Sequence, residues 1–123
     1  MISTHVLDTS LGLPASGISV KLLKKGDGQK GELWKEIGEA VTNVDGRCTF
    51  DCEKAMGVYQ LFFAIEDYLK KEGKDYFFPS AMVVFKIKDT QRKYHVPLLL
   101  NPFGYSTYRG RCGQWKIVRF VLM

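Results

Sequence analysis

The stretch Tyr94–Gly110, YHVPLLLNPFGYSTYRG, decides the fold because it contains two strand-like segments separated by turn residues. The first segment, Tyr94–Leu100, is largely apolar, and the second, Tyr105–Arg109, is rich in aromatic and hydroxyl side chains. Pro102 and Gly104 lie between them, and such residues favour turns over continuous strands. The stretch therefore predicts two consecutive strands.

The same pattern recurs along the rest of the chain, with turn signals roughly every ten residues, as in all-β sandwiches and barrels. Six more strands are expected, at Ile2–Leu7, Ile18–Lys24, Leu33–Thr42, Arg47–Phe50, Val58–Ile65 and Met82–Lys88. One short helix is predicted at Asp67–Lys74, which contains Leu, Lys and Glu and is followed by Pro79. The pattern thus indicates seven or eight strands with one helix.

Two connections carry clear signals. Asn43–Arg47, NVDGR, predicts a hairpin turn because Asp-Gly readily takes the positive backbone angles of tight turns. Arg47 then opens the next strand. Gly26–Gly31, GDGQKG, is expected to be a loop.

The composition sets limits on the class of protein. A length of 123 residues fits one domain, and 46% hydrophobic with 25% charged residues is ordinary for a globular chain. The net charge of +5 comes from scattered basic residues, so no nucleic-acid partner is expected, while a small anionic ligand fits the charge. No run approaches the roughly 18 apolar residues of a membrane span and no leader is recognisable, which predicts an intracellular protein without a membrane partner.

The three cysteines are Cys48, Cys52 and Cys112. An odd number cannot pair completely within one chain, and Cys48-x-x-x-Cys52 lacks a second ligand pair to complete a zinc site. Reduced thiols without a metal are therefore expected.

Three separated residues carry chemistry that is unusual for a sandwich: His5 in STHVLD, Arg47 in TNVDGR and His95 in YHVPLLL. Each alone has an ordinary explanation, since a strand histidine is commonly packed or solvated and an arginine often follows a turn. Their joint meaning depends on whether they meet in space, and sequence spacing does not show this.

Several segments, STHVLDTSLG, PASG, TNVDGR, YQLFFAIEDYLKKEG, YFFP and YHVPLLLNPFGYSTYRG, resemble the transthyretin-related 5-hydroxyisourate hydrolases of purine degradation. The resemblance extends from Ile2 to Gly110, so residues 1–110 are expected to form the hydrolase domain. It implies an all-β, transthyretin-like two-sheet β-sandwich of seven or eight strands with one short helix. It also implies a homotetramer with active sites in a channel between dimers.

The resemblance implies hydrolysis of 5-hydroxyisourate, the product of urate oxidation, to 2-oxo-4-hydroxy-4-carboxy-5-ureidoimidazoline, without metal or organic cofactor. It assigns catalysis to His5, Arg47 and His95, and substrate binding to Tyr108, Arg109 and Gly110.

The residue types suit this chemistry. Water attack on a ring carbonyl needs a base that is neutral near pH 7, and an imidazole with a pKa of about 6.5 meets that need. His95 is the predicted base, and Arg47 the donor to the oxygen on which negative charge develops. His5 either orients the substrate or shares the proton transfer.

The resemblance ends at Gly110. Family chains end in Tyr-Arg-Gly-Ser, whereas Arg111 stands here in the serine position and residues 111–123 form an atypical, mostly apolar tail. An arginine offers only hydrogen-bond donors, so the role of the serine hydroxyl is not transferable. The tail either adds a strand, lies in the channel between dimers, or reflects an alternative exon or reading frame, and we favour the last origin.

Two other hypotheses about function are alternatives to the hydrolase. One is a non-catalytic small-molecule binding module like transthyretin, because a fold alone does not define a function. The other is a hydrolase silenced by its tail. A cytoplasmic location is expected, because a peroxisomal Ser-Lys-Leu address is absent.

Overall fold

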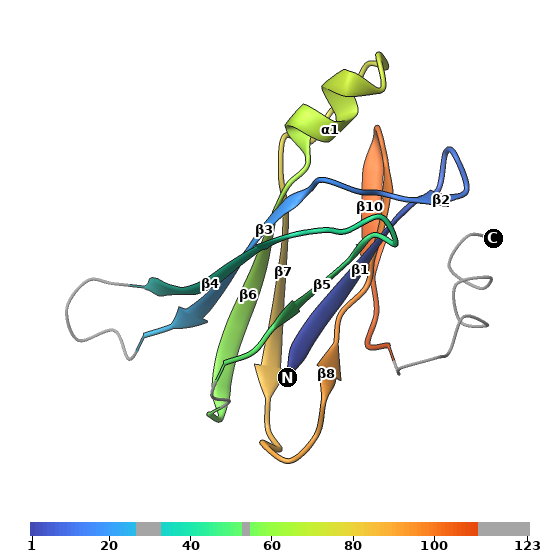
Figure 1. The fold of residues 1–123 in the computed structure, drawn as a ribbon. Helices are drawn as coiled ribbons and strands as arrows, with labels where there is room; N and C mark the ends of the chain where they lie inside the picture. Colours follow the sequence, from blue (N-terminus) through green and yellow to red (C-terminus); the bar gives the residue numbers. More distant parts are fainter. Residues whose placement is uncertain (27–32, 53–54, 111–123) are drawn as a thin grey trace.

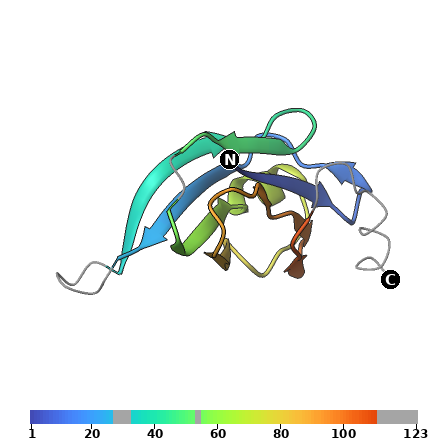
Figure 2. The ribbon, with the colours of Figure 1, turned by 90° about the horizontal axis from the view of Figure 1, so that it is seen from below.

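The computed structural model describes residues 1–26, 33–52 and 55–110, which form two β-sheets packed face to face (Figures 1 and 2). The first sheet contains β1 (Ile2–Asp8), β2 (Leu13–Pro14), β5 (Arg47–Phe50), β8 (Tyr94–His95), β9 (Leu98–Asn101) and β10 (Gly104–Thr107). The second contains β3 (Ser19–Lys25), β4 (Trp34–Val41), β6 (Gly57–Ala64) and β7 (Ala81–Ile87), in the order β4-β3-β6-β7. The predicted β-sandwich is therefore confirmed.

β1 runs through the middle of the first sheet. It pairs antiparallel with β5 and then β2 along one side, and parallel with β8 and then β9 along the other. Side chains alternate between the two faces of a strand, so Ile2 and Val6, which are fully buried in the core, face away from Ser3 and His5. The strand thus contributes one face to the core and the other to the outside of the sandwich.

The core fills the space between the two sheets. Its largest fully buried side chains include Tyr59, Phe63, Leu61, Leu22 and Ile18, which come from β6, β3 and the segment before β3. The alternation predicted at Ile18–Lys24 is seen in β3, where Val20 and Leu22 are buried and Lys21 is partly exposed. Burial of this apolar surface stabilises the sandwich, at roughly 25 cal/mol per Å².

All eight predicted strands are present within the described residues, but the count rises to ten. Leu13–Pro14 adds a short pairing with β1, and the predicted strand Tyr94–Leu100 is divided into β8 and β9. Pro97 lies at the division, where its missing N–H prevents a ladder hydrogen bond. The last strand also ends earlier than predicted, at Thr107 instead of Arg109, because the chain leaves β9 and Gly110 bridges to His95.

A tight turn forms at Asn43–Arg47, with Gly46 at a φ of +75° and its N–H donating to the Asn43 carbonyl at 2.8 Å, but the predicted hairpin is wrong. The turn does not keep its two flanking strands in one sheet, however. β4 pairs with β3, whereas β5 pairs with β1. The turn therefore transfers the chain between sheets, and this transfer brings Arg47 to β1.

The helix α1 (Glu66–Lys71) is shorter than the predicted Asp67–Lys74 and lies beyond one end of the strands (Figure 1). It ends early because Gly73 takes a φ of +71° and its N–H donates to the Lys70 carbonyl at 3.0 Å. The Tyr68 hydroxyl donates to Asp8 Oδ2 at 2.7 Å, which ties α1 to the end of β1. The loop predicted at Gly26–Gly31 and the tail at 111–123 lie outside the described residues, apart from Gly26.

Candidate active site

His5 lies on the outer face of β1 and is nevertheless buried, with 4% of its surface exposed. Arg47 is its direct partner in the antiparallel ladder between β1 and β5. Side chains of directly opposed residues project from the same face of a sheet, about 5 Å apart at Cβ. The sheet register therefore places the His5 imidazole beside the half-buried Arg47 guanidinium.

His95 joins this pair from the other side of β1. It is opposite Ser3 in the parallel pairing of β8 with β1, and its Nδ1 lies 2.8 Å from Ser3 Oγ. The positive charge of Arg47 lowers the pKa of both histidines, and the charge of His95 also lowers the pKa of His5. The structure thus brings together His5, Arg47 and His95, the three residues for which catalysis was predicted.

The two imidazoles are both held in the neutral state. Burial, followed by the nearby Arg47 charge, lowers the pKa of His5 from 6.5 to about 4, although a hydrogen bond with the Asp45 backbone opposes the shift. Burial and the Arg47 charge also lower the pKa of His95. A neutral imidazole has a lone pair that accepts a proton, so the site contains two possible bases at pH 7.

Gly110 packs directly against His95. Its N–H donates to the His95 carbonyl at 2.8 Å. A Cβ at this position would lie 2.8 Å from Cδ2 of His95 and 3.0 Å from Cγ of Pro97. Only glycine allows so close an approach, so Gly110 defines one side of the space that the His95 ring occupies.

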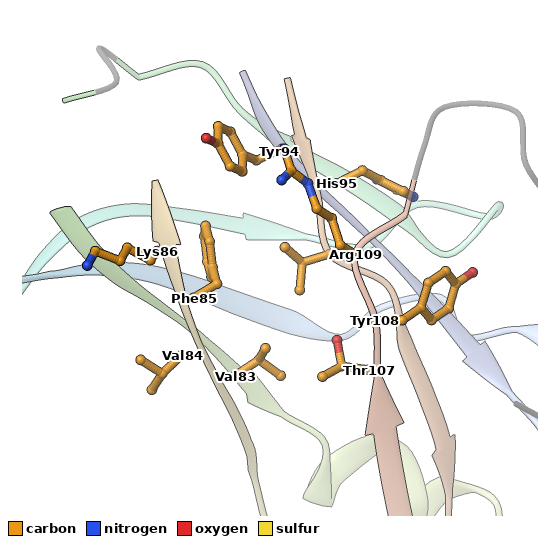
Figure 3. A pocket seen from close by; sticks show the side chains of 10 residues that line it. Val83, Val84, Phe85, Lys86, Tyr94, His95, Thr107, Tyr108 and Arg109 are labelled. Atoms are coloured by element: carbon orange, nitrogen blue, oxygen red, sulfur yellow. The ribbon is translucent and has the colours of Figure 1, made fainter. Parts of the chain in front are cut away.

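Arg109 and Tyr108 follow β10 on the way to Gly110. The Arg109 guanidinium stacks over the Tyr94 ring, 4.7 Å from its centroid, and Figure 3 shows it on the Tyr94 side of the cavity described below. Burial raises the pKa of the Tyr108 hydroxyl, which is therefore protonated at neutral pH. These two residues adjoin His95, but their contacts in this structure are with Tyr94 and the cavity rather than with His5.

A cavity of about 230 Å³ lies between β7 and the segment that follows β10 (Figure 3). Most of its surface is apolar, and His95 contributes to its wall. Its lining residues are Val83, Val84, Phe85, Lys86, Tyr94, His95, Val96, Thr107, Tyr108 and Arg109. His5 and Arg47 are not among these residues, so His95 is the one member of the three-residue cluster that also lines the cavity.

The sequence reasoning missed two contributors to this site. Ser3 stands two residues before His5, which predicts the same strand face, but its contact with His95 depends on a parallel pairing across 92 residues. The Tyr94 ring stacks under the Arg109 guanidinium, a contact that depends on how the chain returns to β8 after β10. The sequence pattern that could have pointed to Ser3 is strand alternation, which places it on the same face of the strand as His5.

Metal ligands do not gather within the described residues: no group of three or more His, Cys, Asp or Glu side chains is placed to hold an ion. Cys48 and Cys52 are free thiols, and burial raises the pKa of Cys48 to about 11. No helix in the described ranges is long and apolar enough to cross a membrane.

Solved structures with this architecture define the class of protein. A 5-hydroxyisourate hydrolase from Klebsiella pneumoniae has a TM-score of 0.76 and 33% sequence identity, covering 89% of this chain and 98% of its own. Sea bream transthyretin in complex with thyroxine has a TM-score of 0.80 and 28% identity, covering 91% and 96%. The fold is thus a transthyretin-like β-sandwich, here with an imidazole and guanidinium cluster on one sheet.

The sequence comparisons then identify the family. The model of the HIUase/Transthyretin family matches residues 2–110, and the chain belongs to this family. A 5-hydroxyisourate hydrolase from Mus musculus is 43% identical over 112 residues, which cover 89% of this chain and 93% of the mouse protein. The resemblance found in the sequence motifs is therefore confirmed.

Proposed function

We propose that this chain hydrolyses 5-hydroxyisourate to 2-oxo-4-hydroxy-4-carboxy-5-ureidoimidazoline, within urate degradation. The observation that carries the proposal is the meeting of His5, Arg47 and His95 on the outer face of β1, β5 and β8. Relatives that bear the name of this enzyme, such as the mouse protein, support the substrate.

His95 is the proposed general base. Its lowered pKa keeps the imidazole neutral at pH 7, and its half-buried position leaves it accessible to a small substrate. His95 takes a proton from water while the water oxygen bonds to a ring carbonyl carbon. The carbon–nitrogen bond of the ring then breaks, and the proton passes to the leaving nitrogen.

Arg47 is the proposed donor to the carbonyl oxygen as negative charge develops there. Its guanidinium carries a permanent charge and a planar set of donors that matches a flat, urea-like anion better than an ammonium group does. A single donor of this kind contributes roughly 3 to 4 kcal/mol to transition-state stabilisation. The half-buried setting strengthens the interaction, because less water competes for the charge.

His5 orients the substrate or shares the proton transfer. With a pKa of about 4 it stays neutral through the physiological pH range. Tyr108, Arg109 and Gly110 complete the proposed substrate site by closing it beside His95. The hydrolase domain is proposed to span residues 1–110, with 111–123 as an appended tail.

Assembly as a homotetramer is part of the proposal. β7 and β10 each have a neighbour on only one side within the described residues, and edge strands of this kind pair readily with other chains. Met82 and Val84 on β7 are 55% and 56% exposed, and Phe103 and Tyr105 are exposed at β10. Apolar side chains at open strand edges favour self-association. Cytoplasmic location and the absence of nucleic-acid partners stay predictions.

Freshly generated 5-hydroxyisourate tests the proposal. Its ultraviolet decay is followed over the spontaneous rate with the full chain and with a form that ends after Gly110 in a serine. Acceleration by the full chain supports the proposal. Acceleration by the shortened form alone identifies a silenced hydrolase, and saturable binding of an aromatic hormone without turnover by either form identifies a binding module.

A further inference from the structure

The Ser3 hydroxyl lies in hydrogen-bond contact with the imidazole of His95. Its Oγ lies 2.8 Å from Nδ1 of His95, within the normal range for a hydrogen bond. Ser3 lies on the middle strand of its sheet, with Thr49 opposite it on β5 and His95 opposite it on β8. Its position is therefore fixed by pairing on both sides.

The backbone around His95 is fixed as well. The Val96 N–H donates to the Ser3 carbonyl at 2.9 Å, and the Thr4 hydroxyl donates to the Val96 carbonyl. On the other side, the His95 carbonyl accepts the Gly110 N–H at 2.8 Å. The backbone is thus held at His95 and at Val96, so the orientation of the imidazole depends on the contacts of the ring itself.

Two contacts determine this orientation. Ser3 Oγ meets the Nδ1 edge, and Gly110 lies close to Cδ2. Nε2 is adjacent to Cδ2 and separated from Nδ1 by one carbon, so Ser3 has no access to it. Nδ1 is therefore the ring nitrogen that contacts the Ser3 hydroxyl, and Nε2 is the nitrogen that can take part in proton transfer.

A neutral imidazole carries one proton, on either nitrogen, and only the other nitrogen accepts a proton. A base that works through Nε2 therefore needs its proton on Nδ1, and a buried N–H needs an acceptor. A serine oxygen has two lone pairs and supplies that acceptor. In other enzymes the partner of the second histidine nitrogen determines the tautomer in this way.

We propose that Ser3 is a positioning residue, which accepts a hydrogen bond from Nδ1–H of His95 and thereby leaves Nε2 as the proton acceptor in hydrolysis. This inference rests on the proposed function, in which His95 is the base. The proton taken from water goes to Nε2, while the Nδ1 proton stays in its bond to Ser3. Ser3 itself does not touch the substrate.

The tautomer is measured directly by ¹⁵N NMR of the histidine rings in the full chain at pH 7.5. The chain has two histidines, and a His5→Asn variant identifies the signals of His95. Protonated and unprotonated ring nitrogens have well-separated shifts. The expected result is a protonated Nδ1 in the wild type and loss of this single tautomer in Ser3→Ala. An unprotonated Nδ1 in the wild type, or an unchanged spectrum in Ser3→Ala, overturns the proposal.

Kinetics supply the second readout. Loss of the hydrogen-bond partner that orients a metal-bound histidine typically costs about 10- to 100-fold in activity, and we take the same range for His95. We expect this loss in kcat for Ser3→Ala, with KM changed less, and recovery of most activity in Ser3→Thr, which restores the hydroxyl. Ser19→Ala is the matched control, because its hydroxyl meets the exposed Glu39 on the other sheet at 3.3 Å. Circular dichroism and a thermal melt establish that each variant is folded.

The outcomes separate this inference from the proposed function. A wild-type chain that does not accelerate substrate decay contradicts the proposed function, while NMR still tests the tautomer. An active wild type with an equally active, folded Ser3→Ala variant contradicts the role of Ser3 alone. A variant that loses kcat but is not restored by Ser3→Thr also contradicts it, because the hydroxyl is then not the group that matters.

Discussion

β1 and β4 are strands of similar length with similar numbers of polar residues, yet most polar side chains of β1 are buried and those of β4 are exposed. β4 is at the edge of its sheet, and Lys35, Glu36 and Glu39 are exposed to water. β1 lies in the middle of the other sheet, and Thr4, His5 and Asp8 are buried. The difference follows from position in the sheet rather than from composition.

Burial changes the chemistry of a polar side chain. In β1, Asp8 accepts hydrogen bonds from Ser10 and Tyr68, and these bonds outweigh its desolvation and lower its pKa. His5 is instead kept neutral by burial and by Arg47. The charged residues of β4 are solvated, as is usual for an exposed strand face. Reactivity in this molecule is therefore expected where the middle strand and its neighbours shield polar groups from water, and the following predictions test that expectation.

The largest effect is expected for His95→Asn. The amide retains a polar group near the position of Nδ1 but removes Nε2, so the proposed base is lost. We expect kcat to fall by about 100- to 10,000-fold, the usual contribution of a general base. The assay is the decay of 5-hydroxyisourate, and Lys35→Gln on β4 is the control that should retain wild-type turnover. Equal turnover by a folded His95→Asn variant would remove His95 from the mechanism.

Arg47→Lys is expected to have the next largest effect. The ammonium group keeps the charge but not the planar set of donors. We expect a loss of about 100- to 1,000-fold in kcat, comparable to loss of one oxyanion donor. Arg47→Gln, compared with it in the same assay, measures how much of the effect belongs to the charge. If lysine substitutes fully for arginine, the planar geometry is not required.

Stability should depend on pH through His5. The folded protein keeps His5 neutral down to about pH 4, whereas the unfolded chain takes up this proton near pH 6.5. The unfolded chain thus binds more protons between these values, and the free energy of unfolding falls as the pH falls from 6.5 to 4. The loss attributable to His5 is about 3 kcal/mol, since one pKa unit corresponds to about 1.4 kcal/mol.

Urea unfolding at fixed protein concentration and several pH values measures this dependence. A His5→Asn variant should show a shallower decline over the same pH range, because the titrating group is gone. An identical slope in the variant and the wild type would show that other groups are responsible. Ser19→Ala is the control: it removes no titrating group, so the pH dependence should stay the same as in the wild type.

The smallest effect is expected for Gly110→Ala. The added Cβ would meet Cδ2 of His95 at 2.8 Å and the Pro97 ring at 3.0 Å, so the imidazole must shift. We expect kcat to fall by about tenfold, as for a modest misplacement of a catalytic group. Gly104→Ala is the matched control, because its Cβ would have no atom closer than 3.9 Å. Similar turnover in both variants would show that the His95 ring tolerates displacement.

Much of the fold was predictable from local patterns. Alternation in Ile18–Lys24 identified β3, and Asp45-Gly46 identified the turn before Arg47. The division at Pro97 was missed because the continuous apolar run through Leu100 is typical of one strand, although Pro97 has no backbone N–H to donate. The site residues His5, Arg47 and His95 were named through the family motifs, and the loop and tail predictions beyond the described residues stay untested.

By itself, the sequence determined most of the segments that become strands, the position of the tight turn before Arg47 and the family of the chain, because these depend on residues near one another along the chain. Only the tertiary structure decided that the Asn43–Arg47 turn crosses between sheets, that β1 takes the middle position, and that Ser3 meets His95. These features depend on pairing between segments up to 92 residues apart. Sheet register and burial, which no local pattern encodes, convert two ordinary histidines and an arginine into a single site.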